Sequence, residues 1–169
     1  SSDGAVEWLD RAIDWVEPVF KKVWLRGDTD FSLTHNFDRW DERVRFVFGY
    51  DAKQKLVVMA DALPERCWKA LERPARYEVK TEERSRPENV KEQVVKEREF
   101  KNIRLQSEQV AEFNYRPVCC KKIYRMVVVR KNLTIEKGEN RLFDDVRYFF
   151  YITNDREKTA AEIVLFAND

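Results

Sequence analysis

Two carboxylates follow a short, mostly apolar segment near the start of the chain. Residues 22–27 are predicted to form a buried strand that ends at Gly27, and Asp28 and Asp30 come soon after it. An α/β protein places acids in this way at the carboxyl end of a strand, where ligands and metals bind. Mg²⁺ and Mn²⁺ prefer such hard oxygen ligands. We therefore predict Asp28 as the leading catalytic and metal-binding candidate, with Asp30 as a second candidate ligand.

The chemistry that these acids suit is phosphoryl transfer with two metal ions. Two ions spaced about 3.5–4 Å apart can activate both oxygens of the displacement, which requires about three convergent acids. The alternative is that Asp28 and Asp30 only begin a loop or cap a helix, because a glycine followed by alternating aspartates is common in turns. The pattern alone leaves both interpretations open.

Nucleophilic catalysis has little support in the sequence. His35 is the only histidine, and Ser32 lies one helical turn before it, which is not the geometry of a catalytic triad. We therefore expect His35 to be a surface or helix-packing residue. The adjacent Cys119 and Cys120 stand where a strand begins, and we expect both thiols to be buried and inert. The chain also has no glycine-rich phosphate-binding loop.

Residues 115–131 form the one basic block of the chain. They carry six positive charges and no acid, and Tyr115 and Tyr124 lie among them. Cations with aromatic neighbours on a β surface can track phosphates and stack bases. The alternative is a solvated sheet face that opposes the Glu-rich segment 78–99. The candidate DNA-binding residues are Arg116, Lys121, Lys122, Arg125, Arg130 and Lys131.

Composition restricts the class of protein more than its function. A chain of 169 residues is long enough for one domain, or for one domain with a sizeable insertion. The net charge of +1 neither requires nor excludes a nucleic-acid partner. Three cysteines without zinc-binding spacing favour a reduced, cytoplasmic setting. No apolar segment approaches the roughly 20 residues that a membrane span needs, so we expect no membrane partner.

The first 70 residues alternate between helix and strand. Val6, Leu9 and Ile13 form one apolar stripe that is typical of a helix over residues 3–17. This helix-strand-helix-strand-helix order predicts a parallel α/β layer. The predicted strands lie at 22–27 and 44–48, and the further helices run from Ser32 to Trp40, over 54–63 and, as a short turn, over 67–71.

The character of the sequence changes after Pro74. The segments that follow are mostly β-like, and runs of short strands after an α/β layer indicate an inserted β-rich unit. Thr159 begins a last helix, with Glu162 completing a capping box. The predicted strands lie at 76–82, 109–115, 121–130, 132–137 and 145–153, and a solvated helix is predicted at 87–99.

Five segments of the sequence resemble bacterial insertion-sequence transposases of the DDE type. The first contains Asp28 and reads LRGDTDFS over 25–32. The next two read FDRWD over 37–41 and RFVFGYD over 45–51. The last two read YRMVVVRK over 124–131 and LFDDVRYFFYITN over 142–154. The resemblance covers nearly the whole chain, and its motifs are long rather than generic.

The resemblance implies an α/β fold with a partial ribonuclease H-like core, in the order helix-strand-helix-strand, and a β-rich (α+β) insertion. It divides the chain into a partial core at 1–70, the insertion at 71–155, and at 156–169 the start of a core helix that leads to the catalytic Glu. Asp28 falls on the family's second catalytic aspartate. The insertion of such enzymes helps to hold transposon-end DNA, which favours DNA binding by the basic block.

The implied activity is cutting and joining of DNA strands at transposon ends, in bacteria and close to the nucleoid. The intact enzyme would use Mg²⁺ or Mn²⁺, and its partners would be transposon-end and target DNA. The family's first catalytic Asp lies upstream of residue 1 and its catalytic Glu lies beyond Asp169. We therefore expect a fragment that is inactive alone and binds no metal tightly, because Asp28 lacks convergent partners.

The resemblance also has a consequence for assembly. The core strands that would pair beside residues 22–27 are not in this sequence, so we expect an exposed strand edge that invites self-association. The alternative to a transposase fragment is a non-enzymatic DNA-binding or protein-interaction module derived from a transposase.

Overall fold

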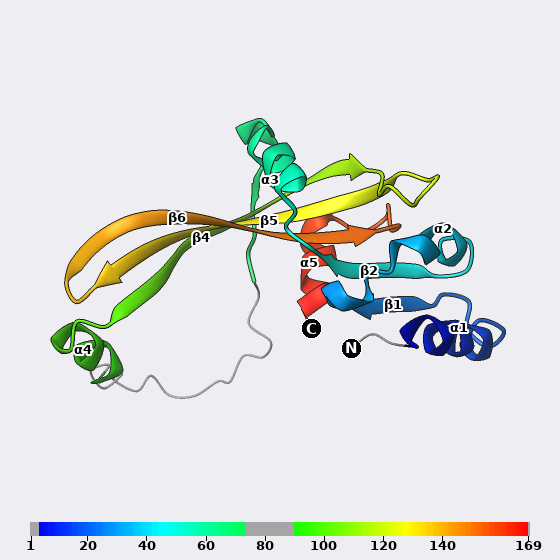
Figure 1. The fold of residues 1–169 in the computed structure, drawn as a ribbon, viewed down its shortest axis with the longest axis horizontal. Coiled ribbons are helices and arrows are strands. Elements are labelled where there is room, and N and C mark those ends of the chain that lie inside the picture. Colours follow the sequence, from blue (N-terminus) through cyan, green and yellow to red (C-terminus); the bar gives the residue numbers. More distant parts are fainter. Residues whose placement is uncertain (1–3, 74–89, 169) are drawn as a thin grey trace, which may run out of the picture.

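The computed structural model describes residues 4–73 and 90–168. Over these residues the fold is mixed α/β, with one six-stranded sheet and five α-helices (Figure 1). None of the helices in these ranges is long and apolar enough to cross a membrane. The elements are α1 (Ala5–Val16), β1 (Trp24–Gly27), α2 (Phe37–Trp40), β2 (Arg45–Tyr50), α3 (Gln54–Asp61), β3 (Lys69–Ala70), α4 (Val90–Glu97), β4 (Lys101–Tyr115), β5 (Tyr124–Lys137), β6 (Asn140–Thr153) and α5 (Ala160–Asn168), with 3-10 helices at Thr29–Phe31, Thr34–Asn36 and Glu65–Cys67.

The sheet has the strand order β1-β2-β6-β5-β4-β3. β1 and β2 are parallel, as the sequence predicts, and every other neighbouring pair is antiparallel. β6 joins the two parts of the sheet, because its last four residues pair with β2 while its whole length runs beside β5. The strands of the predicted insertion therefore continue the same sheet as the strands of the predicted core.

Both faces of the sheet are covered where β2 lies. Phe46 and Phe48 point to the face that α1, α2 and α3 cover, and Val47 points to the face that α5 covers. All three side chains are buried. Since successive side chains of a strand alternate between faces, a strand buried on both sides must be apolar throughout its centre, as the Phe-Val-Phe segment is.

The far halves of β4, β5 and β6 extend beyond these layers as a curved arm (Figure 1). We define the arm as Lys101–Glu108, Lys131–Lys137 and Asn140–Arg147. Its central strand buries Ile135, whereas Ile103 and Phe143 on the flanking strands are about half exposed. Arg104 of the arm bonds to Glu92 of α4 and to Glu136 of β5, so charged groups hold that helix near the arm.

Most predicted elements are confirmed within a few residues, including the capping box, in which Thr159 N donates to Glu162 and Glu162 N donates to Thr159 Oγ1. Three predictions need correction. Residues 121–130 and 132–137 form one strand, β5, and the helical turn at 67–71 is a 3-10 turn followed by β3. Ser32 does not cap a helix, because its hydroxyl donates to the carbonyl of Thr29. The predicted strand at 76–82 lies outside the described residues.

Candidate functional site

Asp28 is the first residue after β1, at the carboxyl end of the parallel pair. Its carboxylate accepts a hydrogen bond from the backbone of Asp30 at 3.0 Å and so caps the 3-10 helix that follows. The chain turns sharply here across the end of β2. A Cβ atom on Gly49 would lie 3.0 Å from Thr29 N and 3.2 Å from the carbonyl carbon of Asp28, so this close approach requires glycine.

A cavity of about 600 Å³ lies at this end of the parallel strands. Asp28 and Asp51 both line it, since one follows β1 and the other follows β2. Asp30 is not among the lining residues, so the structure separates the two candidates. Tyr148 and neighbouring residues of β6 form a second wall, and Ala167 and Asn168 at the carboxyl end of α5 form a third. Four elements therefore converge on the space beside Asp28.

Asp51 was missed by reasoning from the sequence. The signal was present, because Asp51 follows a predicted strand just as Asp28 does, and parallel neighbours end at the same edge of a sheet. The described residues nevertheless contain no group of three His, Cys, Asp or Glu side chains that could hold a metal ion. Asp28 and Asp51 supply hard oxygen ligands but do not complete a site.

The walls of the cavity are fixed by contacts around it. The guanidinium of Arg26 donates to the carbonyl of Phe166 at 2.9 Å, which ties β1 to the last turn of α5. Tyr148 donates its hydroxyl to Asp61 at 2.5 Å. Burial, together with this acidic neighbour, raises the pKa of Tyr148 to about 12, so its phenol stays protonated and acts as a hydrogen-bond donor at neutral pH.

The six cations of the basic block do not form one surface. Along β5 the side chains alternate between the two faces of the sheet, so Arg125 and Lys131 lie on the α5 side and Arg130 lies on the opposite side. Cations that are close together in the sequence of β5 therefore lie on opposite faces of the sheet.

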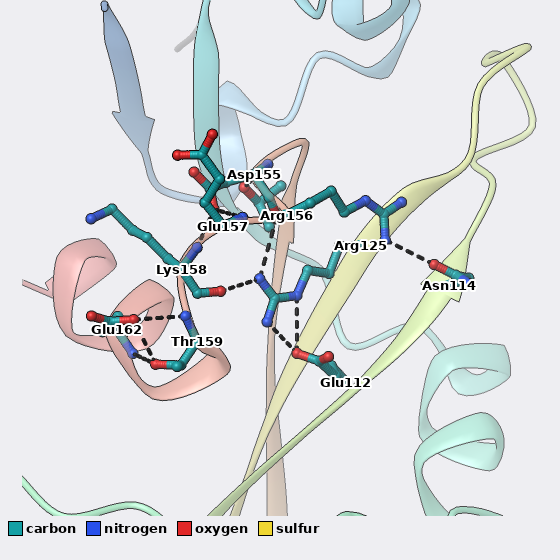
Figure 2. Close-up of polar contacts among 10 residues, drawn as sticks. Glu112, Asn114, Arg125, Asp155, Arg156, Glu157, Lys158, Thr159 and Glu162 are labelled. Carbon is teal, nitrogen blue, oxygen red and sulfur yellow. Dashed lines mark hydrogen bonds and ion pairs between the residues drawn. The ribbon is translucent and has the colours of Figure 1, made fainter.

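Arg125 is buried, which removes it from the candidate DNA contacts. Its guanidinium bonds to Glu112 of β4 and donates to the carbonyls of Asp155 at 3.3 Å and Lys158 at 2.5 Å (Figure 2). The carboxylate of Asp155 in turn accepts from the backbone of Glu157 and Lys158. Arg125 therefore holds the connection between β6 and α5 and is not free to bind a phosphate.

Three further cations of the block are engaged within the protein. Lys122 pairs with Asp41 at 2.9 Å, and Lys131 pairs with Glu108 at 3.1 Å. Arg130 bonds to Glu65 and lies 4.3 Å above the ring of Trp68. A phosphate would have to compete with these carboxylates, so the three are weaker candidates for DNA contact than the sequence suggests.

Arg116 and Lys121 remain as exposed cations on the loop between β4 and β5. Within residues 4–73 and 90–168 their charged groups have no hydrogen-bond or ion-pair partner. The backbone of Lys121 donates to Asp38 at 2.6 Å, so the loop itself is anchored while the ammonium group is free of that contact.

The structure also brings His35 and Cys119 together, which the sequence did not predict. Cys119 Sγ lies 3.3 Å from His35 Nε2, and both residues are exposed. The prediction that His35 is a surface residue is confirmed, and the prediction that Cys119 is buried is wrong. Cys120 is buried as expected.

A search of family models, of curated proteins and of solved structures finds no match to this chain.

Proposed function

We propose that this chain is part of the catalytic domain of a DDE-type transposase and that Asp28 is one of its metal-binding acids. The observation that carries the proposal is the position of Asp28. It follows the edge strand of a parallel pair and lines a cavity together with residues of β2, β6 and α5. This is where an α/β sheet presents an acid to a ligand.

Two further features support the proposal. The resemblance puts the third acid further along the helix that begins with α5, and the carboxyl end of α5 lines the same cavity as Asp28. It also puts the first acid on a strand beside β1, and β1 has a strand neighbour on one side only among the described residues. Both implied acids would therefore approach Asp28 from directions that the fold leaves open.

The described residues of this chain supply only part of a metal site. Asp28 and Asp51 face one cavity, but the described residues offer no set of three ligands. One oxygen of Asp28 is also engaged by the backbone of Asp30. The metal ions would supply charge stabilisation in the intact enzyme, while the residues of this chain position Asp28 and close the cavity with α5.

The decisive experiment uses the product of the whole reading frame that contains these residues, including any sequence on either side of them. That protein should contain an upstream Asp on a strand and a downstream Glu on the α5 helix, and should nick transposon-end DNA in Mn²⁺. Asp28→Asn should abolish nicking, and the matched variant Asp30→Asn should retain it. Flanking sequence without both acids, or an Asp28→Asn protein with full activity, would overturn the proposal.

A DNA-binding module without catalysis is the second candidate, and the free cations on the β4–β5 loop favour it. DNA affinity of this chain, titrated with salt, separates the two. The double variant Arg116→Ala with Lys121→Ala should reduce the slope of log affinity against log salt by up to about 2. The exposed Lys55 of α3 gives a matched control, since Lys55→Ala should leave the slope unchanged. Absence of binding at low salt excludes this candidate.

A further inference from the structure

The loop between β4 and β5 lies against the 3-10 helix Thr34–Asn36, and this contact creates a pair of side chains that suits thiol chemistry. Cys119 Sγ and His35 Nε2 are 3.3 Å apart, although 84 residues separate them in the chain. Both side chains are exposed, so a small molecule can reach the sulfur.

Contacts on either side of His35 hold the loop that carries Cys119 in place. The neighbouring Cys120 donates its thiol to the carbonyl of Thr34 at 3.2 Å. Asp38, one turn after His35, accepts from the backbone of Lys121 at 2.6 Å and from the hydroxyl of Tyr124 at 2.7 Å. Since Thr34 and Asp38 lie on either side of His35, the loop segment that follows Cys119 is joined to the chain both before and after this histidine.

The two adjacent cysteines have opposite chemical character. Burial, with a contribution from the nearby Asp38 charge, raises the pKa of Cys120 to about 11, so this thiol stays protonated and enclosed. Cys119 is exposed and has an imidazole nitrogen within reach of its proton. The thiolate is the reactive form of cysteine, and an adjacent base is the usual way to produce it.

We propose that Cys119 is a nucleophilic thiol, activated by His35, which reacts with electrophiles and with peroxides. His35 Nε2 takes the S–H proton, and the thiolate sulfur attacks one oxygen of a peroxide. The O–O bond breaks, and the leaving hydroxide takes the proton from the imidazolium to form water. Cys119 becomes a sulfenic acid, so the sulfur is oxidised and the peroxide is reduced.

The site is a modification site and not a hydrolytic one. Among the described residues no group hydrogen-bonds to the other ring nitrogen of His35, so the third member of a triad is missing. This property is independent of the transposase proposal, because it involves neither Asp28 nor its cavity.

The chain contains its own controls for a test. The folded protein is treated with iodoacetamide at neutral pH, and separately with hydrogen peroxide and a sulfenic-acid trap, and each cysteine is quantified by mass spectrometry. Cys119 should react about tenfold faster than the half-buried Cys67, and Cys120 should stay unlabelled. His35→Gln should lower the Cys119 rate to that of Cys67 and leave the Cys67 rate unchanged.

Labelling of Cys120 reports whether a variant is folded, because this thiol is buried. If His35→Gln exposes Cys120, His35→Asn serves as the second variant, and the same comparison is made with the variant that keeps Cys120 protected. Equal rates for Cys119 and Cys67 in the wild-type chain would overturn the proposal. So would a Cys119 rate that is unchanged in the folded His35 variant.

Discussion

The long strands of the sheet carry buried side chains in their helix-covered halves and partly exposed side chains in the arm. Near the Asp28 cavity, Phe150 and Ile152 of β6 are almost fully buried under helices. In the arm, Phe143 and Val146 of the same strand are about half exposed. The composition of β6 changes in the same direction, since Asn140–Arg147 contains four charged residues, whereas Tyr148–Thr153 consists of aromatic and β-branched residues.

This difference teaches that strand pairing and helix cover contribute separately to the fold. The arm has backbone pairing along β4, β5 and β6, with one register shift in each strand pair, and surface charges such as Arg104 and Glu136 supplement it. The rest of the sheet, outside the arm, lies under two layers of helices, and we call this helix-covered part the cavity end. Most of the free energy of unfolding should therefore come from the cavity end, and the arm should tolerate substitution.

The largest expected effect comes from removing a buried ring at the cavity end. Phe48→Ala deletes a fully buried side chain that stacks on Phe37, with ring centroids 5.8 Å apart, and should cost about 3–5 kcal/mol. The matched arm variant Phe143→Ala, at a side chain 54% exposed, should cost less than about 1 kcal/mol. Urea denaturation measures both, and equal losses would contradict the comparison.

The buried arginine of the cavity end gives the next largest effect. Arg125→Met leaves two carbonyls of the β6–α5 connection without their donor, and should cost about 2–3 kcal/mol. Arg147→Met removes a half-exposed arm arginine that pairs with Asp145, and its cost should be close to zero. A low cost for Arg125→Met would show that this guanidinium does not hold the connection.

A smaller effect, which depends on pH, is expected at Asp38. Partial burial raises its pKa, but hydrogen bonds from Lys121, Tyr124 and Lys122 outweigh this and hold the pKa below its ordinary value. A lowered carboxyl pKa adds stability above the unfolded value of about 4, and this stability is lost as the pH falls through the folded value.

Asp38→Asn should therefore cost about 1 kcal/mol at neutral pH, and the difference from the wild-type chain should shrink below about pH 4. Asp30→Asn is the control, because the Asp30 carboxylate has no partner among the described residues. Thermal melts at a series of pH values test this, and a difference that grows in acid would contradict it.

The smallest effect should come from the arm itself. Arg104→Gln removes the ion pairs to Glu92 and Glu136 and should leave the urea midpoint of the whole chain unchanged. The local effect should be faster amide hydrogen exchange in α4, which is held near the arm by Arg104. A large shift of the global midpoint would mean that the arm and the cavity end unfold as one unit.

Local patterns predicted the elements well because the strands and helices are strongly apolar at regular spacing. The strands β1 and β2 and the capping box at Thr159 could all be predicted from neighbouring residues. The burial of Arg125 could also have been found, because alternation puts it on the same face as Val127 and Val129. This burial was missed because the charges were counted along the sequence without assigning each side chain to a face of the strand.

Contacts between distant segments could not be predicted in this way. The pairing of Cys119 with His35 depends on how the β4–β5 loop lies against another part of the chain. The meeting of α5 with Asp28 depends on the packing of a helix across the sheet. Periodicity describes each element alone and carries no information about which elements meet. For this reason Asp28 was predicted, but the walls of its cavity were not.

The position of β6 has a consequence for how the chain folds during synthesis. The hydroxyl of Thr153 donates to the carbonyl of Phe46, 107 residues earlier. Until β6 has left the ribosome, no other described strand joins the β1–β2 pair to the β3–β5 unit. The closing step therefore spans most of the chain, and such non-local closure slows folding. A nascent chain would expose the apolar edges of two incomplete units until β6 is made.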